Sequence, residues 1–271
     1  MKIALCIEYD GSNYSGWQKQ SDVDSIQGEI EKALESIALE KLDTYASGRT
    51  DTGVHALIQI IHFDTQSERP ITAWVRGVNS FLPSSIRVLW AQVVDDAFHA
   101  RYSASQRHYE YLVYNASFPS ALWANKTGWI HDELDFKKMK EAIQYFEGEH
   151  DFSAFRSSEC QAKSPVRKMS RTSIENYHPF FLFKFSANGF LHHQIRNMMG
   201  AILYIGKGNH PSDYIKELLL SKDRTKSPPT FSPDGLYLAG VDYDKEYAFP
   251  FMHRTVNIFY NNYLCQDRKS L

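Results

Sequence analysis

Hydrophobic residues recur with two alternating periods along the first hundred residues, and this alternation restricts the fold more than any other feature. Residues 2–9 follow a two-residue period, which predicts a strand with one buried face. A helical period from Ile26 to Ile37 follows, behind Asp24 or Ser25 as the helix cap. The next predicted elements are a strand over 54–63, a helix over 72–81 that ends before Pro83, and a strand over 87–94. This order predicts an open sheet with helices on one face.

The second half of the chain repeats the same alternation. The predicted elements are a strand over 108–114, a helix over 136–146 ended by Gly148, one or two strands within 173–187, helices over 190–205 and 212–221, the latter capped by Ser212, and a strand over 236–243. The halves meet near residues 100–107, without the Pro/Gly linker that is expected between independent domains. We therefore expect two subdomains, 1–103 and 104–271, that share one sheet.

The composition argues against several classes of protein. No apolar stretch reaches the length of a membrane span, and the N-terminus becomes acidic too quickly for a secretory signal. Cys6, Cys160 and Cys265 lie far apart without a C-x-x-C pair, which argues against a disulfide framework and against a zinc site. A cytoplasmic protein is expected, and its hydrophobic content of 43% is enough for a core.

The sequence lacks the common cofactor motifs: the G-x-G-x-x-G fingerprint, the Walker loop and H-E-x-x-H. His192 and His193 come nearest to a metal-binding pair, but adjacent residues on a helix diverge by about 100°. Asp51 and His55 are four residues apart, yet they span a predicted junction of loop and strand. We therefore expect neither a cofactor nor a metal ion.

The formal net charge of −2 gives no support for a nucleic-acid partner, although a local basic face is enough for RNA binding. Between positions 156 and 171, five basic residues are opposed by Glu159 alone: Arg156, Lys163, Arg167, Lys168 and Arg171. A solvated charged loop and an RNA-binding surface both explain this stretch. Of these residues, Lys163, Arg167 and Lys168 are the candidate RNA contacts.

The run from Ala46 to Ala56 concentrates the residues most suited to chemistry. Gly48 and Gly53 allow sharp turns or a close approach of a ligand. Asp51 lies between them on a loop that leads into a strand, and Arg49 is near enough to hold a phosphate or to keep a carboxylate ionised. The alternative is an Asx turn in which Asp51 caps backbone N–H groups.

This run resembles the G-R-T-D-x-G-V-H-A motif of the bacterial tRNA pseudouridine synthase A family. Other motifs follow in the family's order, so that the resemblance covers nearly the whole chain. They are Tyr9–Ser12, Gly16–Gln20, Asn79–Pro83, Phe98–Arg101, Arg107–Tyr111, Cys160–Pro165, Phe190–Asn197 and Gly235–Leu238.

The resemblance implies an α+β fold of two ferredoxin-like (RRM-like) halves that share a mostly antiparallel sheet, with the active-site cleft between them. It implies an isomerase that converts uridine to pseudouridine in the tRNA anticodon stem-loop, at positions 38 to 40, after flipping the base out of its stack. It also implies a homodimer whose cleft spans both chains and a reaction that needs no cofactor.

The resemblance further assigns roles to four residues. Asp51 corresponds to the catalytic carboxylate, as nucleophile or as base, and Arg196 to the arginine that pairs with it. Tyr109 corresponds to the tyrosine that stacks on the target base, and Arg49 is expected to hold the RNA backbone or to assist base extrusion. The residues alone also allow Arg196 on a polar helix face and Tyr109 as a cross-strand packing aromatic.

Two rival functions remain open at this stage. One is a non-catalytic RNA-binding protein on the same scaffold, and the other is a hydrolase that uses Asp51 and His55. Trp17 and Gln18 either pack the cleft or touch RNA. Glu110 departs from the family, because many relatives carry a basic residue between the two tyrosines.

Overall fold

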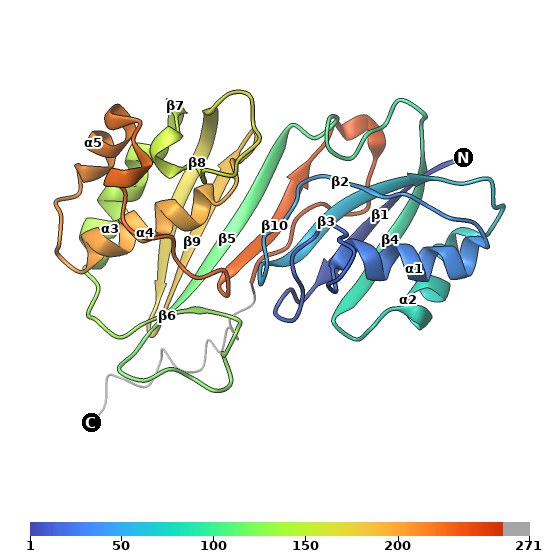
Figure 1. Ribbon diagram of the computed structural model, residues 1–271, viewed down its shortest axis with the longest axis horizontal. Helices are drawn as coiled ribbons and strands as arrows, with labels where there is room; N and C mark the ends of the chain where they lie inside the picture. The colour runs from blue at the N-terminus through green and yellow to red at the C-terminus, as the bar shows by residue number, and fades with distance from the viewer. Residues whose placement is uncertain (257–271) are drawn as a thin grey trace, which may run out of the picture.

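The computed structural model describes residues 1–256 and contains a ten-stranded sheet with its principal helices on one face (Figure 1). Along the main path the strands are β4 (Ile86–Val94), β1 (Lys2–Tyr9), β3 (His55–Asp64), β10 (Leu236–Asp242), β5 (Gln106–Asn115), β9 (Phe180–Ala187), β8 (Val166–Tyr177) and β7 (Gly148–Asp151). Off this path, β2 (Tyr45–Ala46) pairs with β3, and β6 (Gly128–Ile130) pairs with β5. The fold is α+β, with a mostly antiparallel sheet.

Five α-helices accompany the sheet in the part of the chain from 1 to 256: α1 (Ile26–Ala38), α2 (Val78–Phe81), α3 (Phe136–Ala142), α4 (Gln194–Gly206) and α5 (Tyr214–Ser221). The first two lie over the N-terminal strands, and the other three lie over the C-terminal strands (Figure 1). The Ser25 side chain accepts a hydrogen bond from the Gly28 N–H and so caps α1, as the sequence predicts.

One strand joins the two halves of the sheet. β10 runs parallel to β3 on one side and antiparallel to β5 on the other. It is the tenth strand in chain order, yet it occupies the middle of the sheet (Figure 1). The two halves therefore share one continuous set of backbone hydrogen bonds.

Aromatic side chains pack on both faces of the sheet. On the helix face, Phe63 contacts Trp74 edge to face, and Phe181 stacks on Phe136. On the other face of the N-terminal half, Phe98 and Phe249 pack together, and Trp90 stacks on Phe249. Because segments 95–105 and 243–254 cover this second face, the N-terminal strands are buried on both sides.

One predicted helix boundary is wrong, and two other predicted helices have the expected extent but contain irregular turns. Helix α4 begins at Gln194 rather than at 190, because His193 has a left-handed backbone with φ of 61°. Helix α3 ends at Ala142 and continues as a 3₁₀ turn over Ile143–Phe146. The helix predicted over 72–81 opens with a wide π turn at Ala73–Gly77.

Two further predictions, the cap of α5 and the start of β8, differ from the structure. Ser212 does not cap α5, because its hydroxyl donates to Glu141 at 3.0 Å and Asp213 occupies the cap position. Strand β8 starts at Val166, within the basic stretch, rather than near 173. Cys6 and Cys160 are free and buried, and Cys265 lies outside the described residues.

His62 is a buried imidazole on β3 whose charged form the fold disfavours. Its Nδ1 accepts a hydrogen bond from the Ala100 N–H at 3.1 Å. Burial lowers the pKa of His62 from 6.5 to about 4, helped by the nearby His99 and Lys2 and opposed by Asp64. The folded protein therefore holds His62 neutral where an unfolded chain would protonate it.

This shift predicts a pH-dependent free energy of unfolding. Because the unfolded chain binds the proton that folded His62 refuses, stability should fall as the pH drops from about 6.5 toward about 4. Urea unfolding measures the free energy of unfolding at pH 7 and at pH 5. This free energy should fall between the two pH values by about 2 kcal/mol more in the wild type than in His62→Gln. His131→Gln, at an exposed histidine, is the control and should retain the wild-type drop. Equal drops in the wild type and His62→Gln would contradict the assignment.

Candidate active site

Residues of β1 and of the segment that follows it hold the loop that carries Asp51. Tyr9 shares a hydrogen bond of 2.8 Å with the Thr50 hydroxyl, and the Trp17 N–H donates to the Thr50 carbonyl at 3.0 Å. Gly53, with φ of +80°, closes the turn, and the Val54 N–H donates to the Asp51 carbonyl at 3.1 Å. Asp51 therefore projects from a fixed turn immediately before β3.

The start of the same loop is held by side chains from the sheet. The Gln59 amide donates to the Gly48 carbonyl at 2.6 Å. Arg107, on β5, donates to the Ser47 carbonyl at 3.0 Å and also to the carbonyls of Arg101 and Asn188. A guanidinium from the C-terminal half thus fixes a loop of the N-terminal half.

Arg196 lies in the first turn of α4 and contacts Asp51 across the junction of the two halves. Its Nη1 is 3.1 Å from Oδ2 of Asp51, and both side chains are largely buried, at 15% and 20% exposure. Its Nε donates to the Phe231 carbonyl at 3.0 Å, and the Phe231 N–H donates back to the Arg196 carbonyl. The guanidinium is therefore oriented before it meets the carboxylate.

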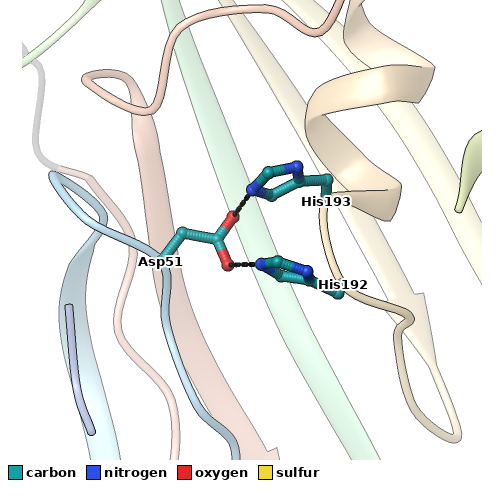
Figure 2. A group of neighbouring side chains, drawn as sticks. All are labelled: Asp51, His192 and His193. Carbon is teal, nitrogen blue, oxygen red and sulfur yellow. Dashed lines mark ion pairs between the residues drawn. The ribbon is translucent and has the colours of Figure 1, made fainter. Parts of the chain in front are cut away.

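Two histidines complete the surroundings of the carboxylate (Figure 2). His192 Nε2 lies 3.4 Å from Oδ1 of Asp51, and His193 Nε2 lies 3.5 Å from Oδ2. The sequence argument that adjacent helical residues diverge does not apply, because both histidines precede α4. The left-handed backbone at His193 lets both rings reach the same carboxylate. Neither histidine is among the site residues predicted from the sequence, because the helix predicted over 190–205 contains both of them.

Charge in this cluster is carried mainly by Asp51 and Arg196. Burial lowers the pKa of His193, with Asp51 opposing this and His192 and Arg196 adding to it. His193 is therefore a neutral imidazole at neutral pH, able to accept or donate a proton. An ionised carboxylate beside a guanidinium and a neutral imidazole can act as a nucleophile or as a base.

The carboxylate opens into a cavity of about 1530 Å³. Tyr109 forms part of its wall, with its ring edge-to-face against Phe190 at a centroid distance of 5.1 Å. Burial raises the pKa of the Tyr109 hydroxyl, helped by the nearby Asp51. Among residues 1–256 this hydroxyl has no hydrogen-bond partner, so it is available to a ligand.

The predicted RNA-binding cations occupy different places. Arg49 and Arg167 line the cavity, and Arg49 is exposed, without an ion pair to any described residue. Arg167 donates to the Ser164 carbonyl at 2.9 Å. Lys163 and Lys168 are exposed and lie outside the cavity lining. Because Arg167 and Lys168 are neighbours on β8, their side chains point to opposite faces.

His55 has a structural role. Its Nδ1 accepts from the Gly11 N–H at 3.1 Å, and its Nε2 contacts the Asp234 carbonyl at 3.0 Å. Nδ1 also lies 3.2 Å from Oδ1 of Asp10, so both ring nitrogens contact groups other than Asp51. The hydrolase built on Asp51 and His55 therefore has no geometric support.

Burial and hydrogen bonds place three further residues named in the sequence analysis: Trp17, Gln18 and Glu110. Trp17 is only 2% exposed and supports the Asp51 loop, whereas Gln18 is exposed at the cavity. Glu110 lies on the opposite face of the sheet, where its carboxylate accepts from the Thr255 hydroxyl and the Val256 N–H. It does not face the cavity.

The ligand atoms of Asp51, His192 and His193 lie within 4.8 Å of one another, as in many metal sites. The guanidinium of Arg196, 3.1 Å from Oδ2, would repel a cation there, so the cluster suits an electrophilic substrate better than a metal. No helix among the described residues is both long and apolar enough to span a bilayer.

Comparison with known proteins identifies the family of this chain. The family model described as tRNA pseudouridine synthase matches residues 5–103 and 142–244. The protein named tRNA pseudouridine synthase A of Nitrosomonas eutropha is 53% identical over 92% of this chain and 90% of that protein. The protein of the same name from Methylobacillus flagellatus is 52% identical over 95% of this chain and 99% of that protein.

Among solved structures, a chain from the crystal structure of the archaeal box H/ACA sRNP Nop10–Cbf5 complex is only distantly similar. It shows a TM-score of 0.38 and 13% identity, over 74% of this chain and 43% of that chain. The two curated relatives, in contrast, match most of the chain at about half identity, and the ranges matched by the family model contain Asp51 and Arg196. On these matches, the chain belongs to the tRNA pseudouridine synthase family.

Proposed function

We propose that this protein converts uridine to pseudouridine in tRNA and that Asp51 is the reacting carboxylate. The contact between Asp51 and Arg196, 3.1 Å long at a large cavity, is the observation that carries the proposal. Membership of the tRNA pseudouridine synthase family supplies the class of reaction and of substrate.

The reaction is an isomerisation that balances without a second substrate. The bond between N1 of uracil and C1′ of ribose breaks, a bond from C5 to C1′ forms, and the proton lost from C5 is matched by one gained at N1. The Asp51 carboxylate can attack the nucleoside or remove a proton, and Arg196 holds the carboxylate in position. His192 and His193, next to both carboxylate oxygens, are placed to move protons.

The target uridine must leave its stack to reach Asp51, at a cost of a few kcal/mol. Tyr109 offers a flat apolar surface and a free hydroxyl for the flipped base. Arg49 and Arg167 line the same cavity and suit the RNA backbone next to the target, whereas exposed Lys163 and Lys168 suit the flanking stem. The family resemblance favours positions 38 to 40 of the anticodon stem-loop as targets.

The halves 1–103 and 104–271 form two ferredoxin-like subdomains in this proposal, with the cavity between them. The separate matches of the family model to 5–103 and 142–244 support the division. The contact of Asp51 from one half with Arg196 from the other supports a site between them. A homodimer in the cytoplasm is proposed from the family resemblance alone.

Asp51→Asn is the direct test. The amide keeps the shape of the side chain but cannot carry its charge, so turnover should fall at least about a thousandfold while tRNA binding persists. Pseudouridine in a tRNA transcript would be measured by mass spectrometry after chemical labelling, and binding by filter retention. A melting temperature like that of the wild type is the control for folding. Product formation by Asp51→Asn at a rate near that of the wild type would rule out the assignment.

Arg196→Lys tests the partner of the carboxylate. A single ammonium cannot reproduce the two contacts that Nη1 and Nε make with Asp51 and Phe231, so we expect turnover to fall about tenfold to a hundredfold. Arg224→Lys is the matched control, because Arg224 contacts Asn197 on the same helix but not Asp51. Equal losses in single-turnover rate for the two variants would assign Arg196 a structural role only.

Two double variants test the cations. Arg49→Ala with Arg167→Ala should lower both the single-turnover rate and the affinity for tRNA. Lys163→Ala with Lys168→Ala removes the same charge and should lower only the affinity. Each lost phosphate contact should reduce the slope of log K against log salt by about 0.7 to 0.9. An unchanged slope in both variants would place the RNA elsewhere on the protein.

A further inference from the structure

A second group of ligand-type side chains lies on the face of the sheet opposite Asp51. His108 Nε2, on β5, is 3.0 Å from Oδ2 of Asp242, at the end of β10. His253 Nε2 is 2.7 Å from Oδ1 of the same carboxylate. The three ligand atoms lie within 4.8 Å of one another. Two imidazoles, with ring centroids 4.7 Å apart, thus point their Nε2 atoms at the two oxygens of one carboxylate.

The backbone around this group is well fixed. β5 and β10 are adjacent central strands. Backbone hydrogen bonds join the residues before and after His253 to β10. The Val241 N–H donates to the Met252 carbonyl, and the Arg254 N–H donates to the Ala239 carbonyl. The imidazole lies so close over Gly240 that a Cβ there would be 2.4 Å from Nδ1 of His253. A side chain at position 240 would therefore displace this ring.

A further contact favours a metal ligand at His108. Its Nδ1 is 2.8 Å from the Ser186 hydroxyl. When Nδ1–H donates to Ser186, the lone pair of Nε2 faces the Asp242 carboxylate, and either a proton on Nε2 or a metal ion bound by both groups stabilises this arrangement. Histidines that bind metals commonly donate their other ring N–H to such a partner.

The surrounding charges do not prevent cation binding. Lys184, which lines the same hollow, pairs with Glu175 at 2.7 Å. Arg254, next to His253, pairs with Glu8. Arg171 also lines the hollow, and buried Glu110 offsets positive charge there. His253 is 51% exposed, which provides a path for an ion.

We propose that His108, Asp242 and His253 form a zinc site, with two nitrogen ligands, one oxygen ligand and a fourth position open to solvent. Imidazole ligands favour zinc over magnesium or calcium, and three protein ligands are the usual set of a zinc site that keeps an open position. The ion would join β5, β10 and the segment around His253. The sequence motifs do not indicate this site, because its ligands come from three separate segments.

Zinc titration of the full chain, stripped with a chelator and followed by calorimetry, tests the proposal. We expect one equivalent to bind the wild type and the affinity to fall at least about a hundredfold in Asp242→Asn and in His253→Ala. Ser186→Ala should weaken binding about tenfold, since it removes only the partner of His108. Zinc should raise the melting temperature of the wild type but not of His253→Ala. Circular dichroism checks that each variant is folded.

His193→Ala distinguishes this site from the cluster at Asp51. It should leave the zinc affinity of the wild type unchanged, and cobalt bound in place of zinc should show the intense visible bands of four-coordinate ions in both proteins. Loss of zinc binding in His193→Ala with its retention in His253→Ala would move the ion to Asp51 and overturn the proposal. Failure of the wild type to bind one equivalent would overturn it as well.

Discussion

The ion pair between Asp51 and Arg196 is the interaction on which the site depends. The two residues are 145 positions apart, and each belongs to a different half of the molecule. The pair can form only when the loop before β3 and the first turn of α4 face each other across β10 and β5. The integrity of the whole sheet is therefore a condition for placing one carboxylate beside one guanidinium.

Both partners are supported by contacts that do not themselves take part in chemistry. Thr50 and Gly53 fix the turn of Asp51, and the Phe231 carbonyl fixes the guanidinium of Arg196. Such support keeps the reacting groups within a narrow range of positions. At 20% exposure, Asp51 keeps access to the cavity while most of its surface is covered by these neighbours.

The sequence predicted the parts of this structure that depend on local patterns. Most helices and strands, the Ser25 cap, and the pairing of Asp51 with Arg196 implied by the family resemblance are present. Hydrophobic periods carry no information about strand order, so the central place of β10 could not be derived. The approach of His192 and His193 to Asp51 depends on a left-handed backbone at a non-glycine residue, which no residue pattern indicates.

The central place of β10 also bears on how the molecule is made. During synthesis, the ribosome releases the nine other strands before residues 236–242 are available. Until then the parts of β3 and β5 that pair with β10, residues 55–56 and 106–111, lack their partner strand, and unpaired strand edges are prone to pairing with other chains. The Asp51–Arg196 ion pair, whose partners lie on either side of β10, can therefore form only after β10 has been synthesised and has joined the two parts of the sheet.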